Sequence, residues 1–270
     1  MFRLVFAVIV CSALVFSGMA DGRAEDAPLN LGLYYEVTWN DIHIADFQVS
    51  LNPAKGDPNA AEMCVVIRTG SIASLAGGYA SDTRARLHYT GAESYKPVRY
   101  HTAFKLKKKA RDIKLHYNAE GNRIAAEINT PPENPGKRAK VSATQKKGAL
   151  DPLALVLAAR ERLIKLTKGV PDIAGKNFTL PMYDGRRRSD MRFDVQARMA
   201  DGIIPVSVTE IAVAGYSKSE LEDRDKARPL VTLYISPERY IPVRAQGASF
   251  FGTSWVKLVK ECATAEACVK

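Results

Sequence analysis

Residues 84–89 read RARLHY and residues 112–117 read DIKLHY, and residues 98–107 between them show the same alternation of apolar and polar side chains. A period of two is typical of a β-strand with one buried and one solvent-facing side. Residues 124–128 alternate in the same way after the turn Glu120-Gly121-Asn122. These segments predict an antiparallel meander whose polar side chains share one face.

The same alternation continues on both sides of this meander. Asn40-Asp41 and Asp184-Gly185 each separate two alternating segments, which indicates β-hairpins. Sheets of more than about ten strands tend to curl or split. We therefore expect a mainly β protein built on a large curved antiparallel sheet, an open barrel or half-barrel. The other expected strands cover residues 63–69, 204–213, 229–236, 240–247 and 252–260.

One helix is expected, at residues 151–167, after a Pro- and Lys-rich connection at 131–148. Asp151 is a good N-cap with Pro152 in the first helical position, and Gly169 followed by Pro171 ends the helix. Apolar side chains cover most of its surface, so we expect it to pack in the concave side of the sheet. The residues expected to face the core and line a ligand groove are Leu153, Val156, Leu157, Leu163 and Ile164.

The first residues are typical of an export signal. Arg3 precedes an apolar run at residues 4–16, and the small residues Gly18 and Ala20 follow it. The run is shorter than the roughly 20 residues that span a bilayer. We expect a signal peptide at residues 1–20, with cleavage after residue 24 as the alternative. The rest, residues 25–270, is then a single β-rich domain released into the periplasm.

Three cysteines remain after that cleavage, Cys64, Cys262 and Cys268. An odd number in an oxidising compartment indicates one disulfide and one thiol, or a bridge between chains. The short spacing favours a Cys262–Cys268 disulfide that fixes the C-terminal tail, with Cys64 as a buried strand thiol. A bridge from Cys64 to either of the other two remains the alternative.

The chain is basic, with 39 Lys and Arg against 29 Asp and Glu and a formal charge of +10. Such a balance suits acidic partners, and export argues against nucleic acid. Each basic residue near an anionic membrane contributes about 1 kcal/mol to binding of the protein. A sheet face that is simply exposed to solvent explains the same row of basic residues. The candidate contacts with an anionic surface are Arg84, Arg86, Arg99, Lys105, Lys107, Lys114, Arg186, Arg187 and Arg188.

No catalytic or metal-binding pattern stands out. His88, His101 and His116 fall on the polar faces of three strands, but zinc requires three or four ligands and no HxH or HExxH spacing occurs. There is no GxSxG motif, and no pair of carboxylates suits glycoside hydrolysis. We expect no metal, no cofactor and no enzymatic activity, with a hydrolase of unrecognised site as a remaining alternative.

Four segments carry a family resemblance: Asp151-Pro152-Leu153, residues 180–187 (LPMYDGRR), residues 35–39 (YEVTW) and residues 240–244 (YIPVR). They resemble the exported bacterial family catalogued as domain of unknown function 3108. The resemblance implies a signal peptide and a curved sheet with an inserted helix, and it supplies no activity or catalytic residues. The expected architecture is also similar to periplasmic lipoprotein carriers, in which a half-barrel holds acyl chains under a helical lid.

The leading hypothesis is a non-catalytic envelope protein that binds a lipid, a lipoprotein or another amphipathic component in the concave side of the sheet. The alternative is a scaffold that binds an envelope protein or an acidic glycan through its basic sheet face. An apolar groove would favour the first, and a filled core with a basic patch the second. A polar pocket with a perturbed acid or base would favour a hydrolase.

Overall fold

The computed structural model describes residues 31–70, 78–91, 94–107, 109–132, 136, 138–222, 229–249, 252–262 and 268. The expected signal peptide at residues 1–20 and its alternative cleavage site after residue 24 lie outside these ranges. So do residues 71–76, for which the sequence also predicts one helical turn, ended by Gly77-Gly78. The strands of the first half are β1 (Leu31–Trp39), β2 (Ile42–Pro53), β3 (Ala60–Thr69), β4 (Tyr79–Tyr89), β5 (Tyr95–Leu106), β6 (Lys109–Tyr117) and β7 (Ile124–Thr130). Those of the second half are β8 (Asn177–Tyr183), β9 (Arg188–Val195), β10 (Ile204–Ala214), β11 (Val231–Ile235), β12 (Pro242–Ser249) and β13 (Gly252–Cys262).

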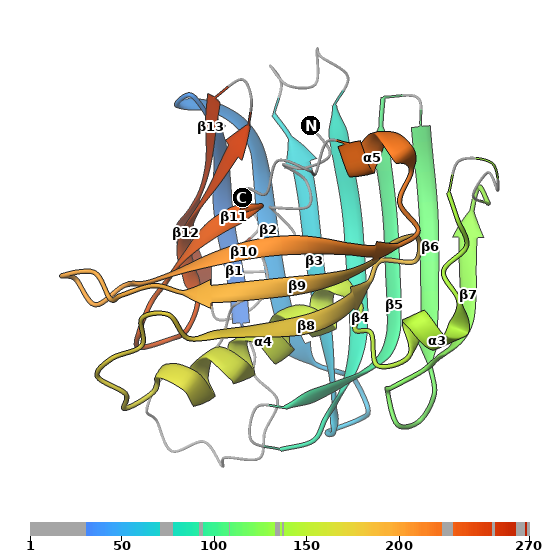
Figure 1. Cartoon of the computed structure of the whole chain (residues 1–270), viewed down its shortest axis with the longest axis horizontal. Coiled ribbons are helices and arrows are strands. Elements are labelled where there is room, and N and C mark those ends of the chain that lie inside the picture. The colour runs from blue at the N-terminus through green and yellow to red at the C-terminus, as the bar shows by residue number, and fades with distance from the viewer. Residues whose placement is uncertain are drawn as a thin grey trace.

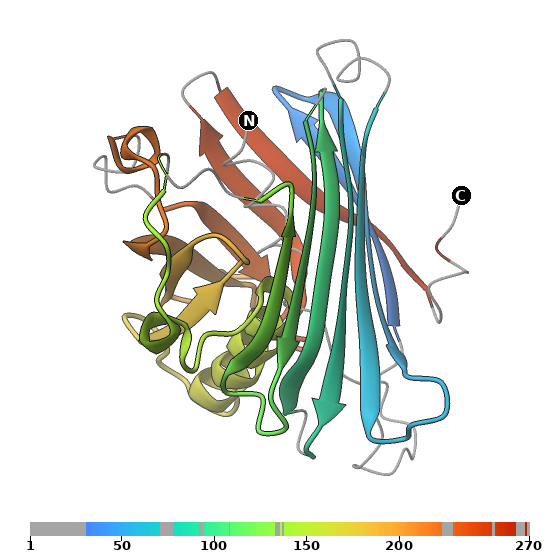
Figure 2. The same ribbon diagram turned by 90° about the vertical axis from the view of Figure 1, so that its right-hand side faces the viewer.

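These 13 strands form one antiparallel sheet in the order β7-β6-β5-β4-β3-β2-β1-β13-β12-β11-β10-β9-β8. Each half is a meander, and β1 joins the halves by pairing with β13. The sheet curls so that β8, β9 and β10 cross the long wall made by β2 to β6 (Figures 1 and 2). The expected curved, mainly β architecture is confirmed.

The curl brings the two edges of the sheet together without closing the barrel. The Tyr183 hydroxyl on β8 donates a hydrogen bond of 2.9 Å to the Glu127 carboxylate on β7. The Asn129 amide on β7 donates one of 3.2 Å to the carbonyl oxygen of Gly185. Side chains therefore bridge the edges, whereas β7 and β8 share no backbone ladder.

The expected helix is α4 (Pro152–Thr167). The Asp151 carboxylate accepts hydrogen bonds from the backbone N–H groups of Leu153 and Ala154, at 2.9 and 3.0 Å. This N-cap provides acceptors for backbone N–H groups of the first helical turn, which have no partner within the helix. The helix lies inside the curl, across one end of the sheet (Figure 1), against β8, β5 and β4.

Two short helices were not predicted: α3 (Ala143–Lys146) and α5 (Lys218–Glu222). The first lies within the connection at 131–148 and begins with a reciprocal capping box between Ser142 and Gln145. Both are too short to show a helical period in the sequence, since one turn already takes 3.6 residues.

The Cys262–Cys268 disulfide is present, with Cα atoms 5.5 Å apart. Both cysteines pack against Tyr34 in a small cluster separate from the main core. Cys64 is a free thiol, but it is half-buried rather than buried. Its neighbours Met63 and Val65 point into the core, so the alternation of β3 turns Cys64 to the outer face.

Asp151 gives the protein a testable dependence on pH. Its side chain is fully buried, and burial raises the pKa of this carboxyl to about 6. A raised pKa in the folded state means that Asp151 favours folding below about pH 4, and that this contribution is lost as the pH rises through 6. Asp151→Asn keeps the cap and removes the charge. We therefore expect the variant to gain stability relative to the wild type between pH 4 and pH 7.

Urea unfolding at several pH values measures this difference. The matched control is Asp172→Asn, an exposed aspartate in the loop after α4, which should leave the pH dependence unchanged. A difference between Asp151→Asn and the wild type that stays constant with pH would show that Asp151 titrates normally.

Candidate functional site

Strand parity gives the long wall of the sheet a buried inner face and a polar outer face. In β4, Ser81, Thr83 and Ala85 are buried, whereas Asp82 and Arg84, between them in the sequence, point outward. The strand register then aligns outward side chains of neighbouring strands in rows. One row is Arg68, Ala80, Lys105 and Ala110; the next is Asp82, Ala103, Asp112 and Thr130; the third is Arg84, His101, Lys114 and Ile128.

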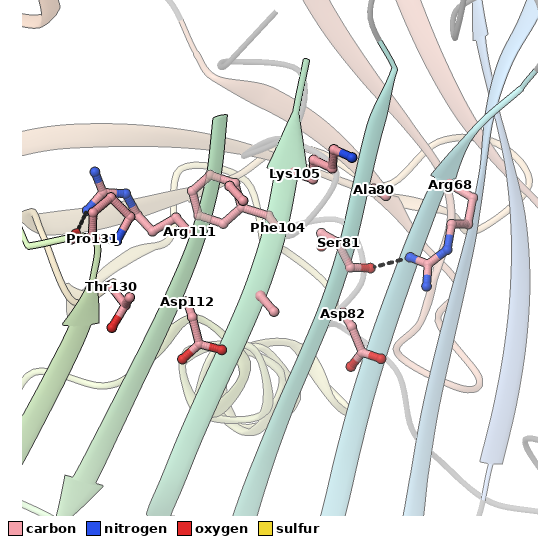
Figure 3. Close-up of a pocket in the computed structure, with 12 residues that line it drawn as sticks. Arg68, Ala80, Ser81, Asp82, Phe104, Lys105, Arg111, Asp112, Thr130 and Pro131 are labelled. Atoms are coloured by element: carbon pink, nitrogen blue, oxygen red, sulfur yellow. Dashed lines mark hydrogen bonds between the residues drawn. The ribbon is translucent and has the colours of Figure 1, made fainter. Parts of the chain in front are cut away.

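Three alanines in the first two rows leave a hollow of about 500 Å³ on this outer face. Ala80, Ala103 and Ala110 line it among the longer side chains of β3 to β6. Figure 3 shows Asp82 on β4 and Asp112 on β6, on either side of β5. Arg68 on β3 lies beyond Asp82, and Thr130 on β7 lies beyond Asp112. The hollow thus combines two carboxylates with basic side chains around a floor of methyl groups.

The third row partly neutralises the two carboxylates. Arg84 contacts Asp82 at 2.9 Å, and a ring nitrogen of His101 lies 2.7 Å from the Asp112 carboxylate. The hydrogen bond from His101, with a smaller contribution from Lys114, holds the pKa of Asp112 below its usual value. Asp112 is therefore an ionised hydrogen-bond acceptor at neutral pH.

The two cations of the first row have no carboxylate partner in the described part of the chain. Arg68 donates hydrogen bonds of 2.8 Å to the carbonyl oxygens of Ile67 and Ser81, which hold its guanidinium in place. Lys105 is exposed on β5. Since neither positive charge is neutralised by a described acidic side chain, both remain available to an anionic ligand.

The basic residues predicted to contact an anionic surface lie in two places, on or next to the outer face of the long wall and at residues 186–188. Arg84, Arg86, Arg99, Lys105 and Lys114 lie on the outer face, and Lys107 lies in the β5–β6 turn. Two of the arginines form ion pairs: Arg84 contacts Asp82, and Arg86 contacts Asp57. These pairs lower the net positive charge of the face. Arg68, which completes the hollow, was missed because only the register places it beside β4.

Residues 186–188 do not form the surface cluster that the sequence suggested. Arg187 is buried and its guanidinium contacts Asp184 at 2.7 Å, so it cannot reach an external surface. Arg188 contacts Asp190 at 2.7 Å and its side chain is largely covered. The reason is the turn itself, which folds against β6: a Cβ on Gly185 would meet Ile113 at 2.2 Å.

The residues predicted to line a ligand groove belong to the core. Leu153, Val156, Leu157 and Leu163 are at most 3% exposed, and Ile164 packs partly buried against the same cluster. These side chains fill the concave side where α4 crosses it. A ligand could occupy their place only if the helix moved away.

The histidines and the helices of the described ranges bear on metal binding and on membrane spanning. There, no three His, Cys, Asp or Glu side chains come together in a way that could hold a metal ion. His88, His101 and His116 lie on the outer face as predicted, on three different strands. No helix of the same ranges has the length and apolar character required to cross a membrane.

The family model described as "Protein of unknown function (DUF3108)" matches residues 34–259, from β1 to β13. The chain belongs to the DUF3108 family. A crystal structure of a β-barrel-like protein of domain of unknown function DUF1849 from Brucella abortus has a similar fold, with a TM-score of 0.51 at 12% identity over 88% of this chain and 98% of that one. None of the curated proteins matches the sequence. This DUF3108 chain thus shares its architecture, at low sequence identity, with a solved β-barrel-like protein.

Proposed function

We propose that this DUF3108 protein is a non-catalytic binding protein that holds an acidic glycan against the outer face of β3 to β6. The hollow is the observation that supports it. Carboxylates such as Asp82 and Asp112 accept hydrogen bonds from sugar hydroxyls. Arg68 and Lys105 supply the charge that an acidic group on the sugar requires.

The surroundings of the hollow favour a chain-like ligand. Arg99 extends the basic character along β5 beyond the hollow, and Lys114 lies near it on β6, 3.5 Å from Asp112. A polymer that lies along the strands would meet these side chains in succession, and its affinity would depend on salt. The scaffold hypothesis with a basic sheet face is therefore favoured over a carrier that encloses a lipid, because core side chains fill the concave side around α4.

A binding role fits the ionisation of the hollow better than hydrolysis does. A glycosidase requires a carboxylic acid that stays protonated near neutral pH, which means a raised pKa. The pKa of Asp112 is instead lowered by His101. The periplasm is the proposed location, on the basis of the leader sequence and of a disulfide that suits an oxidising compartment.

Calorimetric titration with polygalacturonate, using uncharged dextran as the neutral comparison, tests the proposal. We expect binding to polygalacturonate alone, and a loss of about tenfold or more in affinity for Arg68→Ala/Lys105→Ala, since hydrogen bonds to charged groups contribute about 1.5–3 kcal/mol. The control Lys55→Ala/Lys96→Ala removes two exposed lysines at the opposite end of the strands. Equal binding by both variants, or no binding to any acidic glycan, would contradict the proposed function.

A further inference from the structure

The turns of the long wall meet along one rim of the sheet. Trp39 pairs with Ile42 across the β1–β2 turn, and Leu106 pairs with Lys109 across the β5–β6 turn. The register from β1 to β6 carries both turns to the same end of the strands. Both lie at the top of the molecule in Figures 1 and 2. We call Trp39, Ile42, Lys107 and Lys109 the docking rim.

The β1–β2 turn presents apolar side chains to solvent. Trp39 is 36% exposed and Ile42 is 47% exposed. The turn residues Asn40 and Asp41 have φ angles of 45° and 62°, as a tight two-residue hairpin requires. This geometry places the Trp39–Ile42 pair at the tip, beyond the cover of the main core. Tryptophan at such a position is typical of side chains that enter the interface of a bilayer.

The β5–β6 turn presents cations at the same rim. Lys107 and Lys109 are exposed, and no carboxylate in the described ranges forms an ion pair with either of them. Lys105, on the last part of β5, adds a third charge close by. Asp41, in the β1–β2 turn, is the acidic residue of the two turns, so positive charge prevails at the rim.

We propose that the docking rim binds the surface of an anionic phospholipid bilayer, with Trp39 and Ile42 in the interface and Lys107 and Lys109 against the headgroups. Neither feature is sufficient alone, because stable peripheral attachment requires apolar insertion together with a basic patch. Ile211 and Val213, by comparison, are exposed on β10, in the other half of the sheet. The glycan face and the bilayer contact then lie at adjacent places, with Lys105 close to both.

Vesicle sedimentation tests the electrostatic half of the proposal. Mature protein should bind vesicles of phosphatidylglycerol and phosphatidylcholine, and not vesicles of phosphatidylcholine alone. Each basic residue near an anionic surface contributes about fivefold in affinity, so Lys107→Glu/Lys109→Glu should weaken binding by at least about tenfold. The control Lys55→Glu/Lys96→Glu makes the same change of charge at the far end of the strands. Equal losses for the two variants would overturn the proposed orientation.

Fluorescence tests the apolar half. The chain has two tryptophans, and Trp255→Phe leaves Trp39 as the single probe while keeping an aromatic ring against Tyr234. Brominated lipids should then quench Trp39, and Trp39→Ser/Ile42→Ser in the unmodified protein should sediment with vesicles far less than the control Ile211→Ser/Val213→Ser. Unquenched Trp39 would overturn the proposal. So would binding to polygalacturonate without any binding to vesicles, a result that leaves the glycan face intact.

Discussion

Replacing Arg187 with methionine should lower the free energy of unfolding by about 3–5 kcal/mol, the usual cost of leaving a buried charge without its partner. The Arg187 guanidinium donates two hydrogen bonds, of 2.9 and 2.7 Å, to one oxygen of the Asp184 carboxylate. The other oxygen accepts the backbone N–H groups of Arg186 and Arg187. Burial alone would raise the pKa of Asp184, but the charge, the backbone N–H and the side-chain hydrogen bonds of Arg187, with the charge of Arg186, hold it below its usual value.

Urea unfolding of the variant and of Arg192→Met measures this effect. Arg192 contacts Asp194 at 2.8 Å on the neighbouring strand β9, but both side chains are substantially exposed, so its loss should cost less than about 1 kcal/mol. Asp184→Asn combined with Arg187→Met should recover part of the stability, because the variant then has no carboxylate at position 184 that is buried without its partner. Equal losses for Arg187→Met and Arg192→Met would show that burial adds nothing to the Asp184–Arg187 pair.

Truncating Leu157 to alanine should cost about 2–5 kcal/mol through the cavity that it leaves. Leu157 is 3% exposed, and its helix α4 packs against β8, β5 and β4. The control is Leu221→Ala in α5, where the leucine is 45% exposed and truncation should change stability by less than about 0.5 kcal/mol.

The Leu157 measurement also separates a fixed helix from a movable lid. A lid would tolerate the truncation with a small loss of stability and would release a bound lipid more readily. A loss below about 1 kcal/mol, accompanied by weaker lipid retention, would therefore restore the carrier hypothesis. A loss in the expected range supports α4 as a permanent part of the core.

The sequence by itself determined the features that depend on neighbouring residues. The period of two predicted the strands, because successive side chains of a strand point to opposite faces. Asp151 and Pro152 predicted the start of α4, since an N-cap acts on the next few backbone N–H groups. The disulfide between Cys262 and Cys268 was also predictable, because the two cysteines are only six residues apart and close a short loop.

Tertiary structure alone decided the features that depend on contacts between distant residues. The register of β4, β5 and β6 places Ala80, Ala103 and Ala110 around one hollow, and a shift by one residue would turn each of them to the other face. Arg187 is buried because the β8–β9 turn folds onto β6. The sequence around the turn does not predict this contact. The sheet curls around α4 because β1 pairs with β13. These two strands are far apart in the sequence, so their pairing depends on how the whole sheet packs. The alternation within a single strand does not specify it.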